Sequence, residues 1–503
     1  MKTTVNKLIA SIVFIFAGLL IKAQTIEDFL LFSTHEYQAT ARFSGMGGAF
    51  NALGGDFGTL STNPAGIGMY RSSEISFTPA VSSNKTTTSY LGTSINDTRV
   101  RFGIANMGSV STWVTGSEKG LVSYSFGLGY NKLMEFHKYA PLTGNNSTSS
   151  ILDQYLDVAN SSFSYDHQGE IRDESESYIY LASRFPVEQW TAVAAVRNRL
   201  VNNPDPDIDL YEVILQNGDR VNQDRFVSQS GSTGEYVFSA GANISNTFYF
   251  GATVGLQDLS FDKKLSFREQ AVAGNASLYV SNQSNEYYHT EGTGVNLKLG
   301  AIFKPVDAFR VALAFHTPTW YSMESSYSFD MISNTGSGTY STNSPYADIY
   351  QYRFQSPYRF EAGIACLIGK YGLISLDYEL AGYKSMKIRD DWNSQWSQDL
   401  TRSANTAFVN SSNLRIGAEA FLGYGMMIRG GFNYYQAPYS IDADDFERYA
   451  YSGGIGYRGK YFFADFAYVL NTGKYFYFPH AFSATAVEQE DRSRIMLTLG
   501  LKF

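Results

Sequence analysis

Three glycines near the C-terminus have the spacing of a nucleotide-binding loop. Gly454, Gly456 and Gly459 match the dinucleotide fingerprint, in which a glycine-rich turn between a strand and a helix holds a pyrophosphate. Here the glycines lie in a strand-like stretch and its turn, and no helical pattern follows them. We interpret the match as fortuitous, and no nucleotide cofactor is expected.

Acidic and imidazole side chains do not form a recognisable metal site. Asp205, Asp207 and Asp209 alternate as in a calcium loop, but Leu210 and Gln216 stand where an EF-hand needs glycine and glutamate. A solvated acidic loop is the favoured interpretation, and an ad hoc calcium site is the alternative. The histidines show no metal-ligand spacing, although one could serve as a haem ligand: His35, His137, His167, His289, His316 and His480.

Catalytic chemistry is not expected either. No order of serine, histidine and aspartate supports a triad, so a hydrolase is only a weak alternative. The single cysteine, Cys366, cannot form an internal disulfide. A net charge of −8 disfavours nucleic acid, which selects basic surfaces. We therefore predict no catalytic residue, no metal and no cofactor.

A glycine-rich stretch between residues 41 and 66 has the properties of a compact plug. Its glycines permit positive φ and close backbone approach, and an Asn-Pro-Ala turn follows them. Such a plug must satisfy its backbone polar groups against surrounding walls. The alternative is a structural glycine-rich loop. The residues assigned to the plug or gate are Gly45, Gly47, Gly48, Asn63, Pro64 and Ala65.

An apolar cluster precedes the glycines in a short helical pattern. Fully burying one such side chain is worth roughly 1.5–3 kcal/mol, so the cluster is expected to insert into an apolar pocket. A fixed anchor against a wall is the alternative. The candidate pocket residues are Phe29, Leu30, Phe32 and Phe50.

The first 24 residues predict export. Lys2 and Lys7 flank the start of an apolar run from Leu8 to Leu20, and Ala23 and Gln24 close it. This is a signal-peptide pattern, and a retained membrane anchor is the alternative. The predicted organisation is a signal peptide over 1–24, a hatch over 25–73 and a barrel over 74–503.

Strict alternation of apolar and polar residues predicts a membrane barrel. Aromatic residues make up 16 % of the chain and charged residues only 17 %, below the usual quarter for soluble proteins. We predict an all-β transmembrane antiparallel barrel of about fourteen strands with a small N-terminal hatch in its lumen. The strands are expected near 74–82, 99–108, 121–135, 235–245, 247–260, 292–304, 308–318, 358–368, 373–383, 413–422, 426–435, 448–457, 461–470 and 494–503.

Charge and loop length give the barrel its faces and orientation. Short and long links alternate, as they do between the periplasmic and outer ends of these barrels, and an even strand number places both termini in the periplasm. Cys366 is expected to face lipid with Ile364 and Ile368. An inward-facing charge network is predicted for Arg359, Glu361, Asp377, Glu379, Arg415, Glu419, Arg429 and Asp465.

Two stretches carry a family resemblance. Asn63-Pro64-Ala65 follows the glycines and precedes Glu74-Ile75-Ser76-Phe77. This order of segments resembles the hatch and first strand of the FadL/TodX family of outer-membrane transporters. The last strand, ending in Phe503, resembles the closing strand that the outer-membrane assembly machinery reads.

The resemblance implies passive, hatch-gated transport of a hydrophobic small molecule, with long-chain fatty acids as the expected substrate. It also implies a sideways exit through the third strand, where Gly127 and Gly129 are the candidate positions. Expected partners are the substrate, outer-membrane lipid and lipopolysaccharide, and the assembly machinery. A haem-uptake receptor and a secretion-linked structural barrel remain alternatives.

Overall fold

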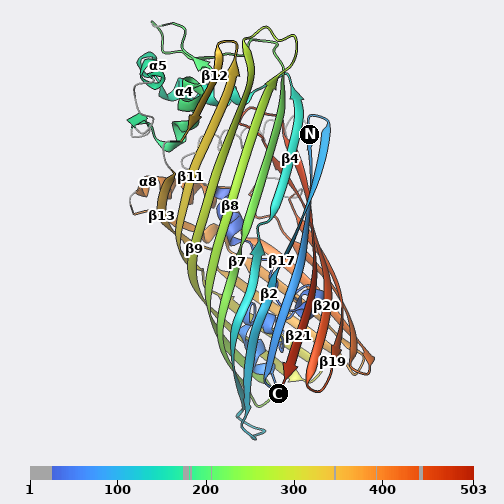
Figure 1. Cartoon of the computed structure of the whole chain (residues 1–503). Coiled ribbons are helices and arrows are strands. Elements are labelled where there is room, and N and C mark those ends of the chain that lie inside the picture. The colour runs from blue at the N-terminus through green and yellow to red at the C-terminus, as the bar shows by residue number, and fades with distance from the viewer. Residues whose placement is uncertain are drawn as a thin grey trace.

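The protein is a closed antiparallel β-barrel, seen here in a computed structural model (Figure 1). The structure describes residues 25–173, 180–181, 184–205, 207–344, 347–391, 393–440 and 446–503. The predicted signal peptide, residues 1–24, lies outside these described residues. Strand β1 (Glu74–Tyr90) pairs with β21 (Ala486–Lys502), and this pairing closes the barrel.

The barrel wall has fourteen strands, as the alternation predicts. Most short turns lie at one end, which we name the short-turn end (Figure 1). The opposite, long-loop end carries the long connections and the two-residue turn between β1 and β2. Between β1 and β21 the wall strands follow in chain order: β2 (Thr93–Val114), β3 (Leu121–Glu135), β7 (Val221–Ile244), β8 (Phe248–Ala271), β9 (Tyr279–Val306), β10 (Phe309–His316), β14 (Arg359–Ile368), β15 (Gly372–Ala381), β17 (Ser411–Gly423), β18 (Met426–Tyr435), β19 (Arg448–Arg458) and β20 (Phe462–Tyr477).

Shorter strands extend the wall toward the long-loop end. Strand β10 continues as β11 (Trp320–Thr335) after a break that contains Pro318, and β13 (Asp348–Gln355) continues as β14 after a break that contains Pro357. Proline lacks the N–H that a ladder needs, so it suits these breaks. The other extensions are β4 (Lys138–Asn146), β12 (Gly338–Asn343) and β16 (Lys387–Arg389).

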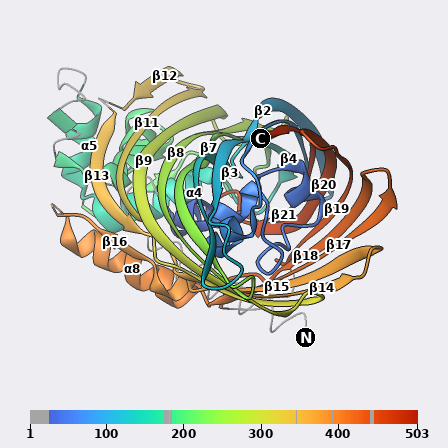
Figure 2. The ribbon, with the colours of Figure 1, turned by 90° about the horizontal axis from the view of Figure 1, so that it is seen from below.

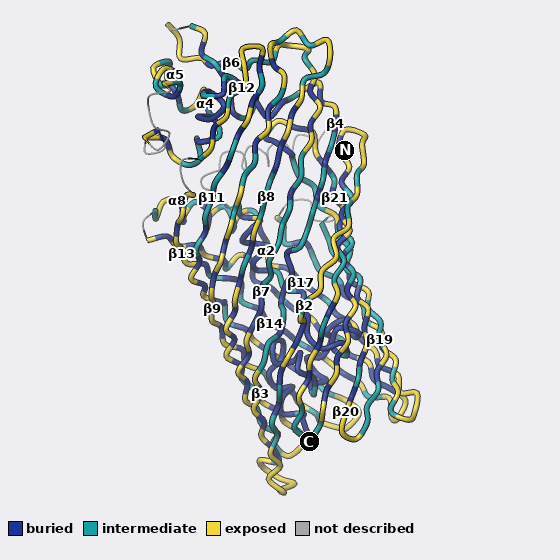
Figure 3. Tube along the Cα trace, viewed as in Figure 1, coloured by how far each residue is buried: buried dark blue, intermediate teal, exposed yellow. Residues whose placement is uncertain are grey.

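Side chains alternate between an apolar outer face and a polar interior. Ile364 and Ile368 are 44 % and 49 % exposed on the outer face, and Cys366 is exposed between them, as the alternation predicts. On the same strand Arg359 and Glu361 are buried inside the barrel. The alternation of exposed and buried residues along the strands is visible in Figure 3. A lipid-facing wall around a polar lumen follows from this pattern.

A folded cap lies at the long-loop end, in the long link between the expected strands 121–135 and 235–245 (Figure 1). Its helices are α4 (Ile151–Ser162), α5 (Tyr165–Arg172) and α7 (Trp190–Arg197), with the 3-10 helix η3 (Val187–Gln189) and the small strands β5 (Val201–Asn202) and β6 (Glu212–Val213). Trp190 of the cap packs against Phe329 on the wall, with ring centroids 6.4 Å apart. The cap therefore shares one hydrophobic core with the inner face of the wall.

Residues 25–73, which we name the luminal segment, lie inside the ring of strands (Figure 2). The segment contains α2 (Ile26–Ser33), α3 (Ala41–Gly45) and the 3-10 helices η1 (Phe57–Ser61) and η2 (Pro64–Met69). Thr25 and Asp28 form a capping box that begins α2. A further helix, α8 (Ser394–Ala407), and the 3-10 helix η4 (Tyr383–Ser385) lie near the long-loop end. Among the described residues, no helix has the length and apolar character of a membrane span.

Candidate functional site: the filled lumen

The Asn-Pro-Ala turn is seated directly on the barrel wall. The side-chain oxygen of Asn63 accepts a hydrogen bond from the backbone N–H of Ala65 at 3.0 Å, and this bond caps η2. A Cβ on Gly251 would collide with Pro64, and a Cβ on Gly300 would collide with Asn63. Glycines on β8 and β9 thus admit this turn to a distance that another residue would prevent.

Of the predicted plug glycines, Gly45 and Gly47 pack against the opposite side of the wall, and Gly48 packs on Phe43 within the luminal segment. Gly47 and Gly48 have φ of +64° and +74°, as expected for a turn that needs glycine. Gly45 instead ends α3, and a Cβ built on it would lie 3.6 Å from the Cα of Gly454. Gly454 and Gly456 of the fortuitous nucleotide fingerprint therefore lie on strand β19, where Gly454 faces the luminal segment, and Gly459 lies just after the strand.

A chain of ion pairs fixes the luminal segment to the short-turn half of the barrel. The Arg42 guanidinium donates from Nε and Nη2 to the Glu419 carboxylate at 3.2 and 3.1 Å. Glu419 also accepts from Arg429, whose Nη1 lies 2.7 Å from an oxygen of Asp465. Because Glu419, Arg429 and Asp465 are buried and Arg42 is mostly buried, each charge depends on its partners for stabilisation.

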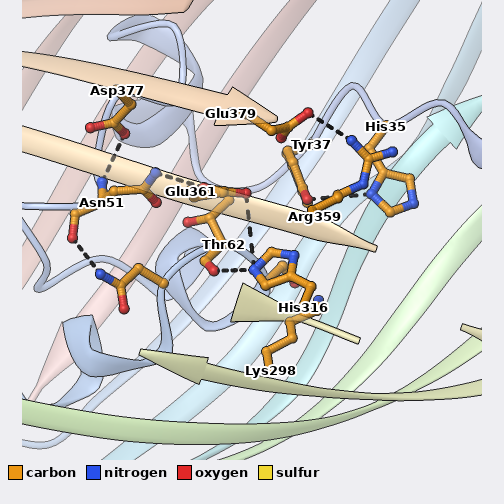
Figure 4. Close-up of polar contacts among 12 residues, drawn as sticks. His35, Tyr37, Asn51, Thr62, Lys298, His316, Arg359, Glu361, Asp377 and Glu379 are labelled. Carbon is orange, nitrogen blue, oxygen red and sulfur yellow. Dashed lines mark hydrogen bonds and ion pairs between the residues drawn. The ribbon is translucent and has the colours of Figure 1, made fainter. Parts of the chain in front are cut away.

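A second polar group, shown in Figure 4, surrounds Asn51 of the luminal segment. The Asn51 backbone N–H donates to Asp377 at 2.9 Å, and its side-chain amide donates to Glu361 at 2.6 Å. Nearby, Glu379 accepts from Arg359 at 2.7 Å and from Arg415 at 2.5 Å. The eight predicted network residues are all buried inside the barrel, which confirms the predicted network: Arg359, Glu361, Asp377, Glu379, Arg415, Glu419, Arg429 and Asp465.

Glu36 is an anchor that the sequence did not single out. Its carboxylate lies 3.0 Å from Arg448, 3.2 Å from Arg492 and 3.6 Å from Arg494. Burial raises the pKa of Glu36, but the three guanidinium groups outweigh burial and hold the pKa below its usual value. The carboxylate is therefore charged at neutral pH and ties the segment to β19 and β21.

The helix α2 fills an apolar pocket near the middle of the lumen, on the side of the luminal segment that is nearer the long-loop end. Phe29 is fully buried, with its ring centroid 5.1 Å from that of Phe354. The Phe32 ring lies 5.3 Å from Phe261 and 6.0 Å from Phe136. Leu30 is buried in the same core, so three of the predicted pocket residues are brought together by one helix.

Phe50 belongs elsewhere, and its grouping with the other three residues was wrong. Its ring stacks on Phe43 at 5.4 Å, and the Arg42 guanidinium lies 5.1 Å from the ring centre. These contacts place Phe50 in the internal core of the luminal segment, apart from the α2 pocket. Hydrophobicity predicted its burial but carried no information about which core would receive it.

The wall is continuous at Gly127 and Gly129, so the expected opening does not lie there. Gly127 pairs with Val110 and Ser239, and Gly129 is likewise paired on both sides. A Cβ on Gly127 would lie 2.7 Å from the Leu60 side chain. The two small residues make room for the luminal segment.

The pairing between β2 and β3 stops two residue pairs beyond Gly129, at Asn106 and Asn131. Beyond this point, β3 turns toward the lumen and pairs with the luminal segment. The carbonyl of Lys132 accepts from the Gln38 N–H at 2.7 Å, and the carbonyl of Leu133 accepts from the Glu36 N–H at 2.7 Å. A register shift within β3 at Lys132 and Met134 accompanies this departure. Neither Gln38 nor Lys132 was singled out from the sequence, because their pairing depends on the folded segment.

Comparisons with known proteins place the fold. No model of a known protein family matches the chain, and no curated protein matches it. The structure is similar to a FadL homologue from Pseudomonas aeruginosa, with 11 % identity, a TM-score of 0.56, and 92 % of this chain and 98 % of that chain covered. It is also similar to the toluene transporter TodX of P. putida (12 % identity, TM-score 0.53, coverage 92 % and 98 %). The toluene transporter TbuX of Ralstonia pickettii gives 14 % identity, a TM-score of 0.50 and the same coverage.

These likenesses establish that the chain has the fold of the FadL and TodX channels, which confirms the predicted fold class. The fold is that of bacterial outer-membrane proteins.

Proposed function

We propose that this protein is a passive channel that carries hydrophobic small molecules across the bacterial outer membrane, with long-chain fatty acids as the candidate substrate. The observation that carries this proposal is the α2 pocket, where Phe29 and Phe32 lie among aromatic side chains of β8, β11 and β13. An apolar molecule could replace these rings without loss of buried surface. Transporters of toluene with the same fold give independent support.

The luminal segment would act as the hatch. Its lower part is held by the ion pairs of Arg42 and by the seat of Asn63, whereas α2 is held mainly by apolar contacts and one ion pair between Asp28 and Lys263 at 3.2 Å. A substrate that binds the pocket better than α2 does would favour the state in which α2 has left. The gate residues would then either move together with α2 or limit its movement. They are Gly45, Gly47, Gly48, Asn63, Pro64 and Ala65.

The exit would be the interruption of pairing between β2 and β3. Met134 and Phe136, next to the departure of β3 from the ladder, also line the α2 pocket. The Lys132 ammonium lies across the interruption, 2.8 Å from where a Cβ on Gly103 would be. A substrate leaving the pocket would pass this point sideways into the membrane.

The short-turn end would face the periplasm and the cap would face outward. Ser73 and Phe503 exchange backbone hydrogen bonds of 3.1 and 3.0 Å at the short-turn end, so both ends of the barrel chain are periplasmic in this orientation. The outer-membrane assembly machinery would then meet the last strand from the periplasm.

The direct test is mass spectrometry of apolar compounds extracted from purified protein, combined with uptake of labelled oleate and labelled toluene by phospholipid vesicles that contain the protein. We expect a bound apolar ligand and uptake faster than in empty vesicles. Copurified haem with no apolar uptake would instead favour a haem receptor. Equal uptake by protein-containing and empty vesicles would overturn the transport proposal.

A further inference from the structure

A cluster of exposed basic residues lies on the outer face of the barrel toward the long-loop end. Strands β13 and β16 pair so that Arg353 is directly opposite Arg389, and Gln355 is opposite Lys387. Phe354 and Ile388, between them, are buried in the lumen core, so the three basic side chains share the outer face. Directly opposite residues lie about 5 Å apart at Cα, which brings the three charges close together.

This arrangement is electrostatically unfavourable on its own. Like charges directly opposite on an antiparallel pair destabilise a sheet. Arg353 is partly compensated by Asp391 at 2.7 Å, although both side chains are about 70 % exposed (68 % and 70 %), so solvent screens this pair. Within the described part of the chain, Lys387 and Arg389 have no ion-pair partner. The cluster therefore has unused capacity for an external anion.

The height of the cluster on the barrel points to the kind of anion. Strand β14 has ten residues, Arg359–Ile368, which is the length needed to cross the apolar core of a membrane. Its outer face is apolar as far as Phe360, which is 40 % exposed. Beyond the proline break the outer face carries Gln355 and then Arg353. The basic residues thus begin where the apolar band ends.

An aromatic residue marks the same level. Trp320 of β11 is 51 % exposed and pairs with Gln355, so Trp320, Gln355 and Lys387 form one row across three strands. Tryptophan is enriched where a membrane core meets the headgroup region. The row above it is Ser322, Arg353 and Arg389. The cluster consequently lies at the level of lipid headgroups, with apolar wall below it for acyl chains.

We propose that Arg353, Lys387 and Arg389 form a binding site for a phosphate group of lipopolysaccharide in the outer leaflet. This inference rests on the orientation given with the proposed function, in which the cap faces outward. Two guanidinium groups can hold phosphate oxygens through paired, charge-assisted hydrogen bonds, and the lysine adds a third donor. The bound phosphate compensates the opposed charges, and the acyl chains of the lipid lie on the apolar wall under Trp320.

The test uses the full-length mature protein in detergent and native mass spectrometry. The probes are purified diphosphorylated lipid A, the same lipid after its phosphates have been removed, and phosphatidylglycerol. We expect one lipid A to bind at least tenfold more tightly than either of the other lipids. The variant Arg353→Gln/Lys387→Gln/Arg389→Gln is expected to lose at least tenfold in lipid A affinity.

The matched control also removes three exposed positive charges from the long-loop half, but from separate places: Lys85→Gln/Arg220→Gln/Arg268→Gln. It is expected to bind lipid A within twofold of the unaltered protein. Should the first triple variant fail to fold, Arg389→Gln alone should still weaken binding measurably. The site is overturned if the cluster variant binds as tightly as the control, or if phosphatidylglycerol binds as tightly as lipid A.

The two proposals fail separately. Uptake is measured in phospholipid vesicles that contain no lipopolysaccharide, so loss of uptake with intact lipid A binding rejects only the transport proposal. Intact uptake without lipid A binding rejects only the phosphate site. Lipopolysaccharide that copurifies from cells with the unaltered protein, and at least fivefold less with the cluster variant, would support the site in its native membrane.

Discussion

A single carboxylate, that of Glu419, joins the luminal segment to the wall by accepting hydrogen bonds from both Arg42 and Arg429. Removing one member of a buried ion pair leaves an uncompensated charge and costs about 3–5 kcal/mol. We therefore expect Glu419→Gln to lower the free energy of unfolding by an amount of that order, measured in urea with the protein in detergent. Glu118→Gln, in an exposed turn, is the control. Equal urea midpoints for the two variants would contradict this account of the anchor.

Glu36 gives the attachment of the luminal segment a pH dependence. Its pKa in the folded protein is below the usual 4.5, so its contribution to stability is present above that value and is lost as pH falls through the folded pKa. We expect Glu36→Gln to be less stable than the unaltered protein at pH 7, and the difference to shrink as pH falls below 4.5. Free energies of unfolding measured for both proteins across this pH range test the direction of the effect. A difference between the two proteins that does not change with pH would contradict this role of Glu36.

At the scale of residues, the sequence predicted functional side chains only where periodicity gave them a direction. Arg415 and Glu419 alternate with apolar neighbours on one strand, so their inward orientation could be inferred. Glu36 could not be found in this way, because its partners Arg448 and Arg492 lie 412 and 456 positions away. The seat of Asn63 on Gly300 similarly depends on contacts made only in the closed barrel.

The helix α2 is the element whose displacement would open the pocket. Truncating a buried phenylalanine to alanine costs roughly 3–5 kcal/mol, so Phe29→Ala/Phe32→Ala should weaken the seating of α2 strongly. Because the strand ladders are untouched, we expect the barrel to keep its heat stability while uptake of labelled oleate at limiting concentration rises.

Leu31→Ala, a partly exposed position on the same helix, is the matched control. Unchanged uptake in the double variant would reject the gate. Lowered heat stability with normal uptake would show that α2 is a fixed anchor.

The pairing between the luminal segment and β3 offers a second test at this scale. Gln38 and Lys132 are antiparallel bridge partners, and such neighbours lie within the range of Cα separations that a disulfide spans. In a Cys366→Ser background, Gln38→Cys/Lys132→Cys should reduce uptake when oxidised and restore it on reduction. Equal uptake by the oxidised and the reduced variant would mean that the luminal segment does not need to separate from β3.

At the scale of elements, the existence and order of all fourteen wall strands could be predicted, but their lengths could not. Strand β1 was expected over 74–82 and runs to Tyr90, and β8 was expected over 247–260 and runs to Ala271. Beyond the apolar band the outer faces of these strands are polar, as at Lys85 of β1 and Arg268 of β8, so the apolar outer face that reveals a membrane strand is lost. The cap helices were missed because their apolar residues pack on the wall, as Trp190 does on Phe329.

For the whole molecule, the lumen is filled from both ends. The luminal segment occupies the short-turn half and reaches the middle with α2, while the cap packs over its own core at the long-loop end (Figures 1 and 2). A fourteen-strand barrel without such fillings would leave an aqueous channel. In the proposed mechanism, movement of α2 would change the connection between pocket and membrane without any change in the wall.

The orientation of the whole barrel is testable through three cysteine positions. Native Cys366 faces lipid, so a membrane-impermeant maleimide should label it poorly in cells. In a Cys366→Ser background, Ala276→Cys on a long connection should be labelled on intact cells. Tyr424→Cys, at a fully exposed position (100 %) in a short turn, should react only after the outer membrane is permeabilised. If Tyr424→Cys is labelled on intact cells and Ala276→Cys is not, the orientation is inverted, and the outward cap and the outer-leaflet phosphate site are both rejected. Rapid labelling of Cys366 would show that the assigned faces of β14 are reversed.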